Sequence, residues 1–365
     1  MNLETHFSTE DARYMARALE LARKGLWSTD PNPRVGCVIV NQGEIVGEGW
    51  HQIAGEAHAE VHALAAAGEK ARGGTAYVTL EPCNHQGRTP PCAEALVRHG
   101  LARVVAAMED PNPLVAGKGL KRLQDAGITT QSGLLAQDAE NLNPGFIQRM
   151  RTGKPWIRSK IGMSLDGRTA MASGESQWIT GPQARQDVHR LRARSSAIVT
   201  GSGTVLADNP AMTARVTEAH QTLKQPVRIL LDSMLRCPRD ARFFEASGSY
   251  RVLTLQEPNQ DQLASTHRLP ASPRGGIDLS AVSEWLGQEG FNEVLFECGP
   301  TLNGALLAAG VVDEWIIYMA PRVLGDHGRG LFHLPGLERL ADAPHLKLTQ
   351  CRQVGQDIRL TIRSR

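Results

Sequence analysis

A histidine and two cysteines that lie far apart in the chain place the strongest limit on its fold. The segment H-A-E begins at His58, a P-C step ends at Cys83, and a second P-C step ends nine residues later at Cys92. One imidazole and two thiols can bind a zinc ion through three ligands and leave its fourth position open for water. A fold that uses them together must bring a helix start, a strand end and a second helix start to one point.

The carboxylate of Glu60, two positions after His58, is suited to shuttle protons to that water and to a leaving amine. H-x-E…P-C is the signature of zinc-dependent nucleobase deaminases, in which the glutamate is an acid and base and not a ligand. The spacing of His58 and His62 also suits a metalloprotease helix, but there a glutamate follows the first histidine directly, and Ala59 stands here. We expect hydrolytic loss of ammonia from a heterocycle, with His62 solvated or outside the ligand set.

Size and composition indicate two ordinary globular domains and exclude several protein classes. The chain has 365 residues, 41% hydrophobic and 21% charged, and a formal net charge of +2. This charge gives no support for a nucleic-acid surface. The N-terminal residues lack the apolar core of a signal peptide, and no run of about 18 apolar residues predicts a membrane span. Six scattered cysteines fit reducing, cytoplasmic conditions rather than a disulfide scaffold.

The first half alternates helical and strand patterns, which predicts an α/β sheet with helices on both faces. The expected elements are helix 8–25, strands 35–40 and 44–50, helix 57–71, strand 75–80, helix 92–99 and strand 102–108. Residues 140–156 resemble a helix end that runs into a Gly-Lys-Pro linker. We therefore expect a first domain over 1–150 and a second over 151–365.

The second half has its own series of strands and helices. We expect strands at 156–163, 197–200, 227–232, 251–255, 293–298 and 314–320, a hairpin at 346–363, and helices at 182–194, 281–289 and 301–309. The stretch 257–276, rich in Pro, Gln, Ser and Arg, is typical of an exposed connection.

Three stretches of this half are rich in small or polar residues: 160–178, 200–210 and 297–302. The second and third follow strands, where exposed backbone amides and a helix N-terminus attract phosphate. The segment G-S-G-T-V-L lacks the third glycine of a dinucleotide-binding fingerprint, and no Walker A loop is present. These residues alone leave a nucleotide site and ordinary tight turns as equal alternatives.

Four segments together resemble the deaminase half of the bifunctional deaminase/reductase family of riboflavin biosynthesis: PNPRVG (31–36), GWH (49–51), AHAE (57–60) and LEPCNHQGRTPPC (80–92). tRNA and cytidine deaminases generally place two residues between their cysteines, so the eight residues here argue against those branches. The resemblance implies a cytidine-deaminase-like three-layer α/β/α domain with Glu60 as proton donor and one zinc ion per chain, held by His58, Cys83 and Cys92. It also suggests four substrate contacts, each equally compatible with a loop or turn role: Asn32, His51, His85 and Arg88.

The segments S-L-D-G-R-T-A, G-E-S-Q-W-I-T, T-V-L-A-D-N-P and E-C-G-P-T-L resemble the reductase half of the same family, whose α/β fold is similar to dihydrofolate reductase. The resemblance implies NADPH bound by Trp178, Thr204, Asp208, Ser233, Gly299, Pro300, Thr301, Leu302, Asn303, Gly304 and Ala305. It implies substrate contacts from Ser176, Arg192, Met212, Arg215 and Glu297. Arginines suit a substrate phosphate because their planar fork matches its oxygens, although Arg192 could also belong to a solvated helix face.

The resemblance implies two successive reactions on a small molecule. The first is deamination of 2,5-diamino-6-ribosylamino-4(3H)-pyrimidinone 5′-phosphate, and the second is reduction of the ribosyl chain of the product to ribityl by NADPH. Lys160 and Glu297 are candidates for the acid of the second step. Arg236 and Arg239 either meet the 2′-phosphate of NADPH or are loop cations.

Two other hypotheses for the function of the chain remain open at this point. One is a nucleic-acid-directed zinc deaminase with a C-terminal binding domain, which near-balanced charge and 5% aromatic residues do not favour. The other is a structural zinc module attached to a ligand-binding domain, with His85 as a fourth ligand. We expect no nucleic-acid or membrane partner, and a homo-oligomer stays open.

Overall fold

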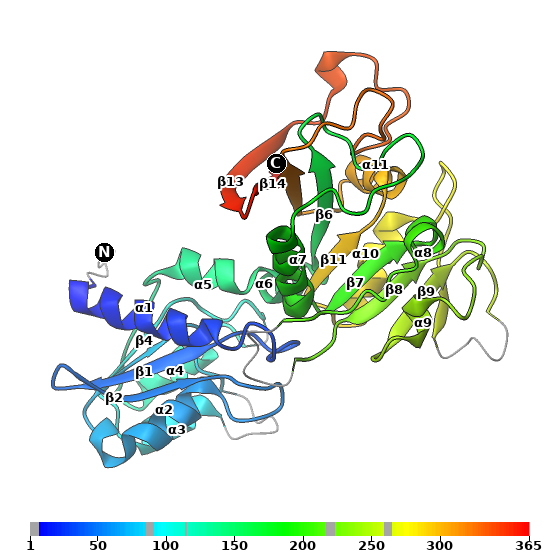
Figure 1. Ribbon diagram of the computed structural model, residues 1–365. Helices are drawn as coiled ribbons and strands as arrows, with labels where there is room; N and C mark the ends of the chain where they lie inside the picture. Colours follow the sequence, from blue (N-terminus) through cyan, green and yellow to red (C-terminus); the bar gives the residue numbers. More distant parts are fainter. Residues whose placement is uncertain (1–6, 85–90, 114, 217–222, 259–264, 365) are drawn as a thin grey trace. The chain divides into compact units, whose positions relative to one another are not determined.

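The computed structural model describes residues 7–84, 91–113, 115–216, 223–258 and 265–364. The chain divides into two compact units, Met1–Thr152 and Gly153–Arg365. Each unit has its own sheet and its own hydrophobic cores. Figure 1 labels most of their helices and strands.

The first unit is built on a sheet with the strand order β2-β1-β3-β4-β5. β1 pairs antiparallel with β2 and β3, whereas β3, β4 and β5 run parallel. The strands are β1 (Gly36–Asn41), β2 (Glu44–Trp50), β3 (Thr75–Val78), β4 (Arg103–Ala106) and β5 (Thr129–Ser132). The helices are α1 (Thr9–Arg23), α2 (Ala59–Ala67), the 3-10 turn Gly68–Ala71, α3 (Cys92–Arg98), α4 (Lys118–Asp125), α5 (Ala136–Leu142) and α6 (Pro144–Thr152).

Alternate residues of these strands enter two cores, one on each face of the sheet. Ile39 and Val78 pack with residues of α2, α3 and α4. Val38 and Tyr77 pack with residues of α1, α5 and α6. The alternation follows from the two-residue period of a strand, which sends successive side chains to opposite faces. The three-layer α/β/α fold expected for this half is confirmed.

Two glycines allow helices to pack directly on this sheet. A Cβ on Gly36 would lie 2.0 Å from the carbonyl oxygen of Ala18 in α1. A Cβ on Gly49 would lie 2.4 Å from the carbonyl oxygen of Ala59 in α2. Any side chain at either position would push the helix away from the sheet. Because Ala59 directly follows His58, the contact at Gly49 fixes how far this histidine stands from the sheet.

The second unit contains a sheet with the order β10-β9-β8-β7-β11-β6-β12-β14-β13. The strands from β10 to β12 run parallel, and β14 and β13 add an antiparallel hairpin. The strands are β6 (Trp156–Ser164), β7 (Ala197–Gly201), β8 (Val227–Leu231), β9 (Tyr250–Thr254), β10 (Thr266–Arg268), β11 (Glu293–Glu297), β12 (Glu314–Ala320), β13 (Leu346–Val354) and β14 (Asp357–Ser364). The helices are α7 (Pro182–Arg194), α8 (Ser202–Asp208), α9 (Arg242–Glu245), α10 (Leu279–Gln288), α11 (Pro300–Ala309) and the 3-10 turn Leu340–Asp342.

One expectation for this unit is wrong. The stretch 257–276, expected as an exposed connection, contains β10, which pairs parallel with β9 and buries Thr266. Only three residues of this edge strand are paired, so its sequence carries too little alternation to be recognised.

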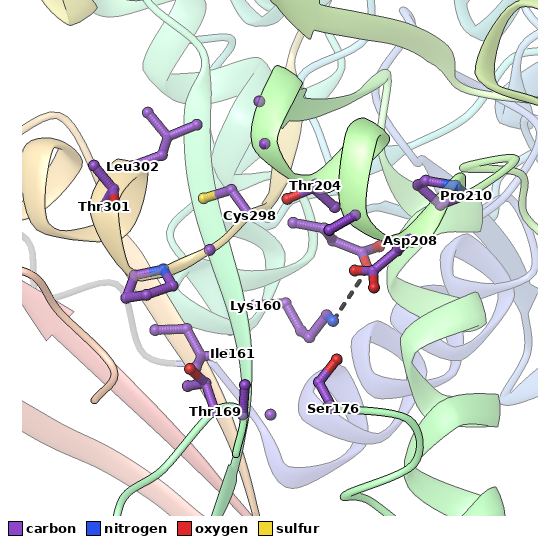
Figure 2. Close-up of a pocket in the computed structure, with 18 of the residues that line it drawn as sticks. Lys160, Ile161, Thr169, Ser176, Thr204, Asp208, Pro210, Cys298, Thr301 and Leu302 are labelled. Carbon is purple, nitrogen blue, oxygen red and sulfur yellow. Dashed lines mark ion pairs between the residues drawn. The ribbon is translucent and has the colours of Figure 1, made fainter. Parts of the chain in front are cut away.

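Helices cover both faces of the second sheet, and a cavity opens at one edge. α10 and α11 pack on one face, and α7, α8 and α9 pack on the other. The cavity, with a volume of about 1450 Å³, is lined by the carboxyl ends of β6, β7, β8 and β11 and by the segments that follow them (Figure 2). This edge of a parallel sheet is where α/β proteins bind ligands. Among the described residues, no helix combines the length and apolar character needed to cross a membrane.

Candidate active sites

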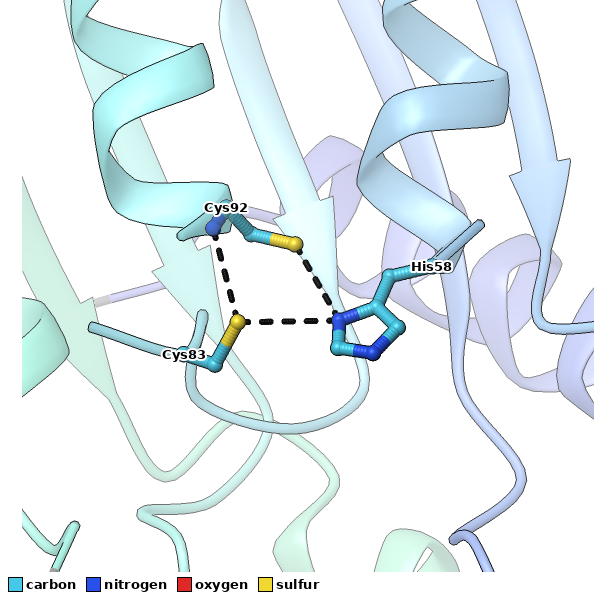
Figure 3. Close-up of side chains that lie close together, drawn as sticks. All are labelled: His58, Cys83 and Cys92. Atoms are coloured by element: carbon cyan, nitrogen blue, oxygen red, sulfur yellow. Dashed lines mark hydrogen bonds between the residues drawn. The ribbon is translucent and has the colours of Figure 1, made fainter. Parts of the chain in front are cut away.

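The three expected metal ligands of the first unit come together from three elements (Figure 3). His58 is the N-cap of α2, with φ −78° and ψ 167°. Cys83 follows β3, and Cys92 is the first residue of α3. His58 was expected inside the first helical turn, whereas it precedes the helix in extended backbone. Two residues that stand two positions apart within a helix point to different sides of it, but His58 lies before the helix. The side chains of His58 and Glu60 can therefore face one point.

The separations between the ligand atoms fit zinc. Nδ1 of His58 lies 3.6 Å from Sγ of Cys83 and 3.3 Å from Sγ of Cys92. A tetrahedral site with usual zinc–sulfur and zinc–nitrogen lengths places such atoms about 3.5 Å apart. Within the part of the chain that the structure describes, no fourth His, Cys, Asp or Glu joins this cluster.

Glu60 lies beside this cluster and is 3% exposed. Burial raises the pKa of its carboxyl to about 7, although the charge of His58 opposes part of that rise. Its side chain reaches the thiol of Cys92. A carboxyl with a pKa near neutrality can both accept and release a proton at the working pH.

The contact between the two cysteines shifts their pKa values in opposite directions. The hydrogen bond from Cys92 and the contacts with His58 lower the pKa of Cys83, against the effect of burial, whereas the contact with Cys83 and burial raise the pKa of Cys92. The backbone N–H of Cys92, at the start of α3, donates to Sγ of Cys83 at 3.4 Å. The N-terminus of this helix therefore favours the thiolate of Cys83.

Two of the four suggested substrate contacts stand next to the cluster. The imidazole of His51 is buried, and its Nδ1 lies 3.0 Å from the carbonyl oxygen of Ala57. Its Nε2 lies 3.1 Å from Nδ2 of Asn32. The ring of His51 meets the ring of His58 edge to face, with centroids 5.5 Å apart. His51 thus links Asn32 to the metal-binding histidine.

Three further residues of this half were considered from the sequence: His85, Arg88 and His62. His85 and Arg88 lie outside the described residues. His62 is partly buried on α2, does not join the ligand set, and its Nε2 is buried without a hydrogen-bond partner among the described residues.

Sequence reasoning missed Glu81, which directly precedes the Pro-Cys83 step. Its buried carboxylate accepts hydrogen bonds from the backbone N–H groups of Asp110, Gly117, Gly119 and Leu120, at 2.8 to 3.2 Å. A carboxylate accepts several such bonds and thereby orders the loop that donates them. Glu81 therefore fixes both the segment before α4 and the first turn of α4 against the chain that carries Cys83. No local pattern reveals this role, because all four donors are backbone groups.

The cavity of the second unit collects most of the residues expected to hold a nucleotide and substrate. Those that line it are Trp178, Thr204, Asp208, Ser233, Gly299, Pro300, Thr301, Leu302, Ala305, Ser176, Arg192, Met212, Arg215 and Glu297. Its volume exceeds that of usual drug-sized sites, about 300–1000 Å³, and leaves room for two ligands. Gly299 caps α11 without a side chain, so the backbone N–H groups of this helix start are open to a phosphate. The donor set therefore fits a dinucleotide.

Two residues of the expected cofactor loop do not line this cavity. The side chain of Asn303 is buried, where it accepts a hydrogen bond from Ser159 and donates one to the carbonyl oxygen of Cys298. A Cβ on Gly304 would lie 2.0 Å from the carbonyl oxygen of His333. Asn303 fixes the loop and Gly304 permits close packing of α11, and the expected contact of these two residues with NADPH stays a prediction.

A charged cluster occupies the floor of the cavity. Arg192 holds both carboxylate oxygens of Glu297, with Nε at 2.6 Å and Nη2 at 3.0 Å. Nζ of Lys160 lies 3.1 Å from Oε2 of Glu297. Burial alone would raise the pKa of Glu297, but Arg192 and Lys160 outweigh it and hold the pKa well below its usual range. Glu297 is therefore ionised, and Arg192 is engaged with it rather than open to a phosphate.

The structure also separates the two arginines suggested for a 2′-phosphate. Arg236 lines the cavity, and its Nη2 donates to Oγ of Ser202 at 3.2 Å. Arg239 is exposed and does not line the cavity. The sequence missed two further lining residues, Arg185, which stacks on Trp178 at 4.7 Å, and His189. Both lie on α7 among other polar residues, so their spacing carries no signal.

Comparison with known proteins assigns the chain to a family. Residues 8–108 match a family model described as the cytidine and deoxycytidylate deaminase zinc-binding region, and residues 155–360 match the RibD C-terminal domain. The riboflavin biosynthesis protein RibD of Escherichia coli (strain K12) is 56% identical over 360 residues, which span 96% of this chain and 98% of that protein. The chain belongs to the RibD family.

Other relatives match over the same length. RibD of Haemophilus influenzae is 50% identical and covers 97% of this chain and 98% of its own length. A structure of Acinetobacter baumannii RibD is 46% identical, with a TM-score of 0.91 over 98% of this chain and 99% of that one. A Thermotoga maritima structure titled diaminohydroxyphosphoribosylaminopyrimidine deaminase/5-amino-6-(5-phosphoribosylamino)uracil reductase is 31% identical, with a TM-score of 0.87 over the same shares.

The family establishes what the chain does at the level of its two activities. It is a deaminase and reductase of riboflavin biosynthesis, with a cytidine-deaminase-like unit followed by a RibD-type reductase unit. Zinc serves the first activity and NADPH the second.

Proposed function

We propose that the first unit deaminates 2,5-diamino-6-ribosylamino-4(3H)-pyrimidinone 5′-phosphate and that the second reduces the ribosyl chain of the product. The observation that carries the first assignment is the convergence of His58, Cys83 and Cys92 beside a buried carboxyl, Glu60. Three protein ligands that leave one position open are typical of a catalytic zinc site rather than a structural one.

In the first reaction, Glu60 moves the protons. His58, Cys83 and Cys92 would hold the zinc ion, which would supply an activated water at neutral pH. The carboxylate of Glu60 takes a proton from the attacking water and passes one to the departing ammonia. His51 and Asn32 orient the pyrimidinone beside the cluster. Burial of Glu60 keeps its pKa near 7, which suits both halves of this transfer.

In the second reaction, the cavity mainly supplies position and charge. Trp178, Thr204, Asp208, Ser233 and the loop from Gly299 would hold NADPH, which would supply the hydride for C1′ of the ribosyl chain. Lys160 is the acid that protonates the substrate, because Glu297 is held ionised and has no proton to give. Arg215 receives the substrate phosphate, since Arg192 is engaged with Glu297.

One experiment tests both assignments. Purified protein is incubated with the pyrimidinone phosphate, first without and then with NADPH. We expect ammonia release without the nucleotide, followed by NADPH consumption equal to the ammonia formed. Ammonia release that requires single-stranded RNA or DNA, or that falls steeply with salt, would favour a nucleic-acid-directed deaminase instead. We place both reactions on a free mononucleotide in the cytoplasm, where reducing conditions keep the cysteines as thiols.

The ligand assignment predicts how zinc is lost. Cys92→Ser removes one of three protein ligands, so zinc affinity should fall by more than about a hundredfold, the upper range for substitutions outside the ligand shell. The measurement is zinc content by atomic emission after dialysis against a chelator. Cys351→Ser, which changes an exposed cysteine of the second unit, is the matched control and should retain one zinc ion per chain. Equal zinc content in the two variants would contradict the assignment.

The position of Arg236 predicts cofactor preference. Arg236→Gln should raise KM for NADPH about tenfold and leave KM for NADH nearly unchanged, because a charge-assisted hydrogen bond to the 2′-phosphate is lost. Arg239→Gln, three residues away and outside the cavity, should change neither constant. Initial rates with each nucleotide decide the outcome. A larger effect of Arg239→Gln would reverse the assignment of the two arginines.

A further inference from the structure

His189 and Arg215 face each other on the wall of the reductase cavity. His189 lies on α7, and Arg215 lies in the segment that follows α8. Both line the cavity. His189 is half-buried, and the side chain of Arg215 is exposed to the cavity solvent. None of the reaction steps above uses His189.

The imidazole of His189 contacts Arg215 through both ring nitrogens. The backbone N–H of Arg215 donates to Nδ1 at 3.3 Å, and Nη2 of its guanidinium lies 3.2 Å from Nε2. A neutral imidazole has one accepting nitrogen and one N–H. When Nε2 accepts, it holds the guanidinium of Arg215. When Nδ1 accepts, it holds the backbone. In either tautomer the ring fixes Arg215.

Burial and nearby positive charges keep the ring of His189 neutral. Burial, together with the positive charges of Arg192 and Arg215, lowers the pKa of His189 to about 4, against a smaller opposing effect of Glu297. The proton is therefore absent at neutral pH. A protonated ring would present a cation to Arg215 and could not accept its hydrogen bonds.

Arg192 and Arg215, which both line the cavity, have partners of different charge. Arg192 holds a carboxylate, Glu297, which cancels its charge. Arg215 holds an imidazole, and no carboxylate within 4.0 Å of it is found in the described ranges of the chain. A neutral acceptor orients a guanidinium without cancelling its charge, so Arg215 keeps its full attraction for an anion.

We propose that His189 is a positioning residue that aims Arg215 at the phosphate of the ribosyl substrate and so sets the affinity for phosphorylated substrates. The inference rests on the proposed function, because it takes Arg215 as the phosphate contact. The proposed role requires that the side chain of His189 accept a hydrogen bond and that it carry no charge.

Three substitutions separate these two requirements. His189→Gln keeps a neutral acceptor near Nε2, and KM for the deaminated phosphate substrate should stay within about twofold. His189→Leu removes the acceptor, and KM should rise about three- to tenfold with kcat unchanged. His189→Glu keeps an acceptor but adds a charge that neutralises Arg215, and KM should rise at least as much as with leucine. A packing role for His189 would instead give Gln and Glu similar values, and that result would overturn the proposal.

A double-mutant cycle with Arg215→Gln ties the effect to this pair. In that background His189→Leu should raise KM no further, because the group it positions is absent. Additive effects would contradict the proposal. The dissociation constant of ribose 5-phosphate, measured by calorimetry, should follow the same order of variants, whereas ribose binding should not change.

The controls distinguish failure of this inference from failure of the proposed function. Ammonia release should be equal in all His189 variants, since that reaction belongs to the first unit. Wild-type protein that does not oxidise NADPH with the deaminated substrate would overturn the proposed function. Wild-type reduction together with unchanged KM and ribose 5-phosphate affinity in His189→Leu would overturn only the role of His189.

Discussion

Glu60→Gln should lower the rate of ammonia release by about a thousandfold and leave the zinc content at one ion per chain. The amide keeps the size of the carboxyl but cannot take up and release the proton that the departing ammonia needs, a contribution of typically 10²–10⁴. The measurement is ammonia release from the pyrimidinone phosphate together with zinc content of the same preparation. Retained zinc separates loss of proton transfer from loss of the site.

The matched control for Glu60→Gln is the second activity of the same protein. Reduction of the chemically prepared deaminated substrate by NADPH should proceed at the wild-type rate, because Glu60 belongs to the first unit. Unchanged ammonia release in this variant would favour a structural zinc module and reject the deaminase assignment of this carboxyl.

Lys160→Met should lower kcat for NADPH oxidation by about a hundredfold and leave ammonia release unchanged. Methionine has a similar length and no proton to donate, and the expected loss lies at the lower end for general acid catalysis. The substitution also removes one of the two cations paired with Glu297, but Arg192 still holds both carboxylate oxygens. Stopped-flow absorbance of NADPH with the deaminated substrate measures the step directly.

Lys160→Arg serves as the companion variant. It keeps the positive charge beside Glu297 but holds its protons far more tightly than an ammonium. If Lys160 is the acid, the arginine variant should be nearly as slow as the methionine variant. If Lys160 only balances charge, arginine should restore most of the rate, and the acid must then be sought elsewhere in the cavity.

The sequence predicted those elements whose pattern is strong and local. Strand 44–50 and helix 182–194 agree in both bounds with β2 and α7. The turn that ends at Gly43, directly before the strand, and the proline at the start of the helix are clear boundary signals. By contrast, α4 has only eight residues with Leu120 and Leu123 as its buried large side chains, and β5 has four residues with none buried. Such short segments carry too few apolar positions to define a period.

The same difference applies to the two candidate sites: residue type and spacing support a prediction, whereas contacts between distant segments could not be predicted. The metal ligands could be predicted because their residue types and spacing are rare. The state of Arg192 could not, because its carboxylate partner Glu297 is 105 positions away in the sequence. Likewise, the sequence motif indicated the loop that contains Asn303. Whether the side chain of Asn303 faces the cavity or the protein interior depends on the path of the backbone. Contacts between distant segments decide such questions, and one sequence does not contain them explicitly.

The carboxylate of Glu81 has a consequence for how this enzyme can be redesigned. It recognises only main-chain amides, which every residue except proline supplies, so the side chains between Asp110 and Gly117 are largely interchangeable as far as this anchor is concerned. The length of that segment, by contrast, must stay constant, because an insertion or deletion would shift the donors away from the carboxylate of Glu81. Gly119 is equally constrained, since a Cβ there would lie 1.9 Å from the carbonyl oxygen of Pro82. A library that varies composition at constant length should therefore preserve the metal-binding loop.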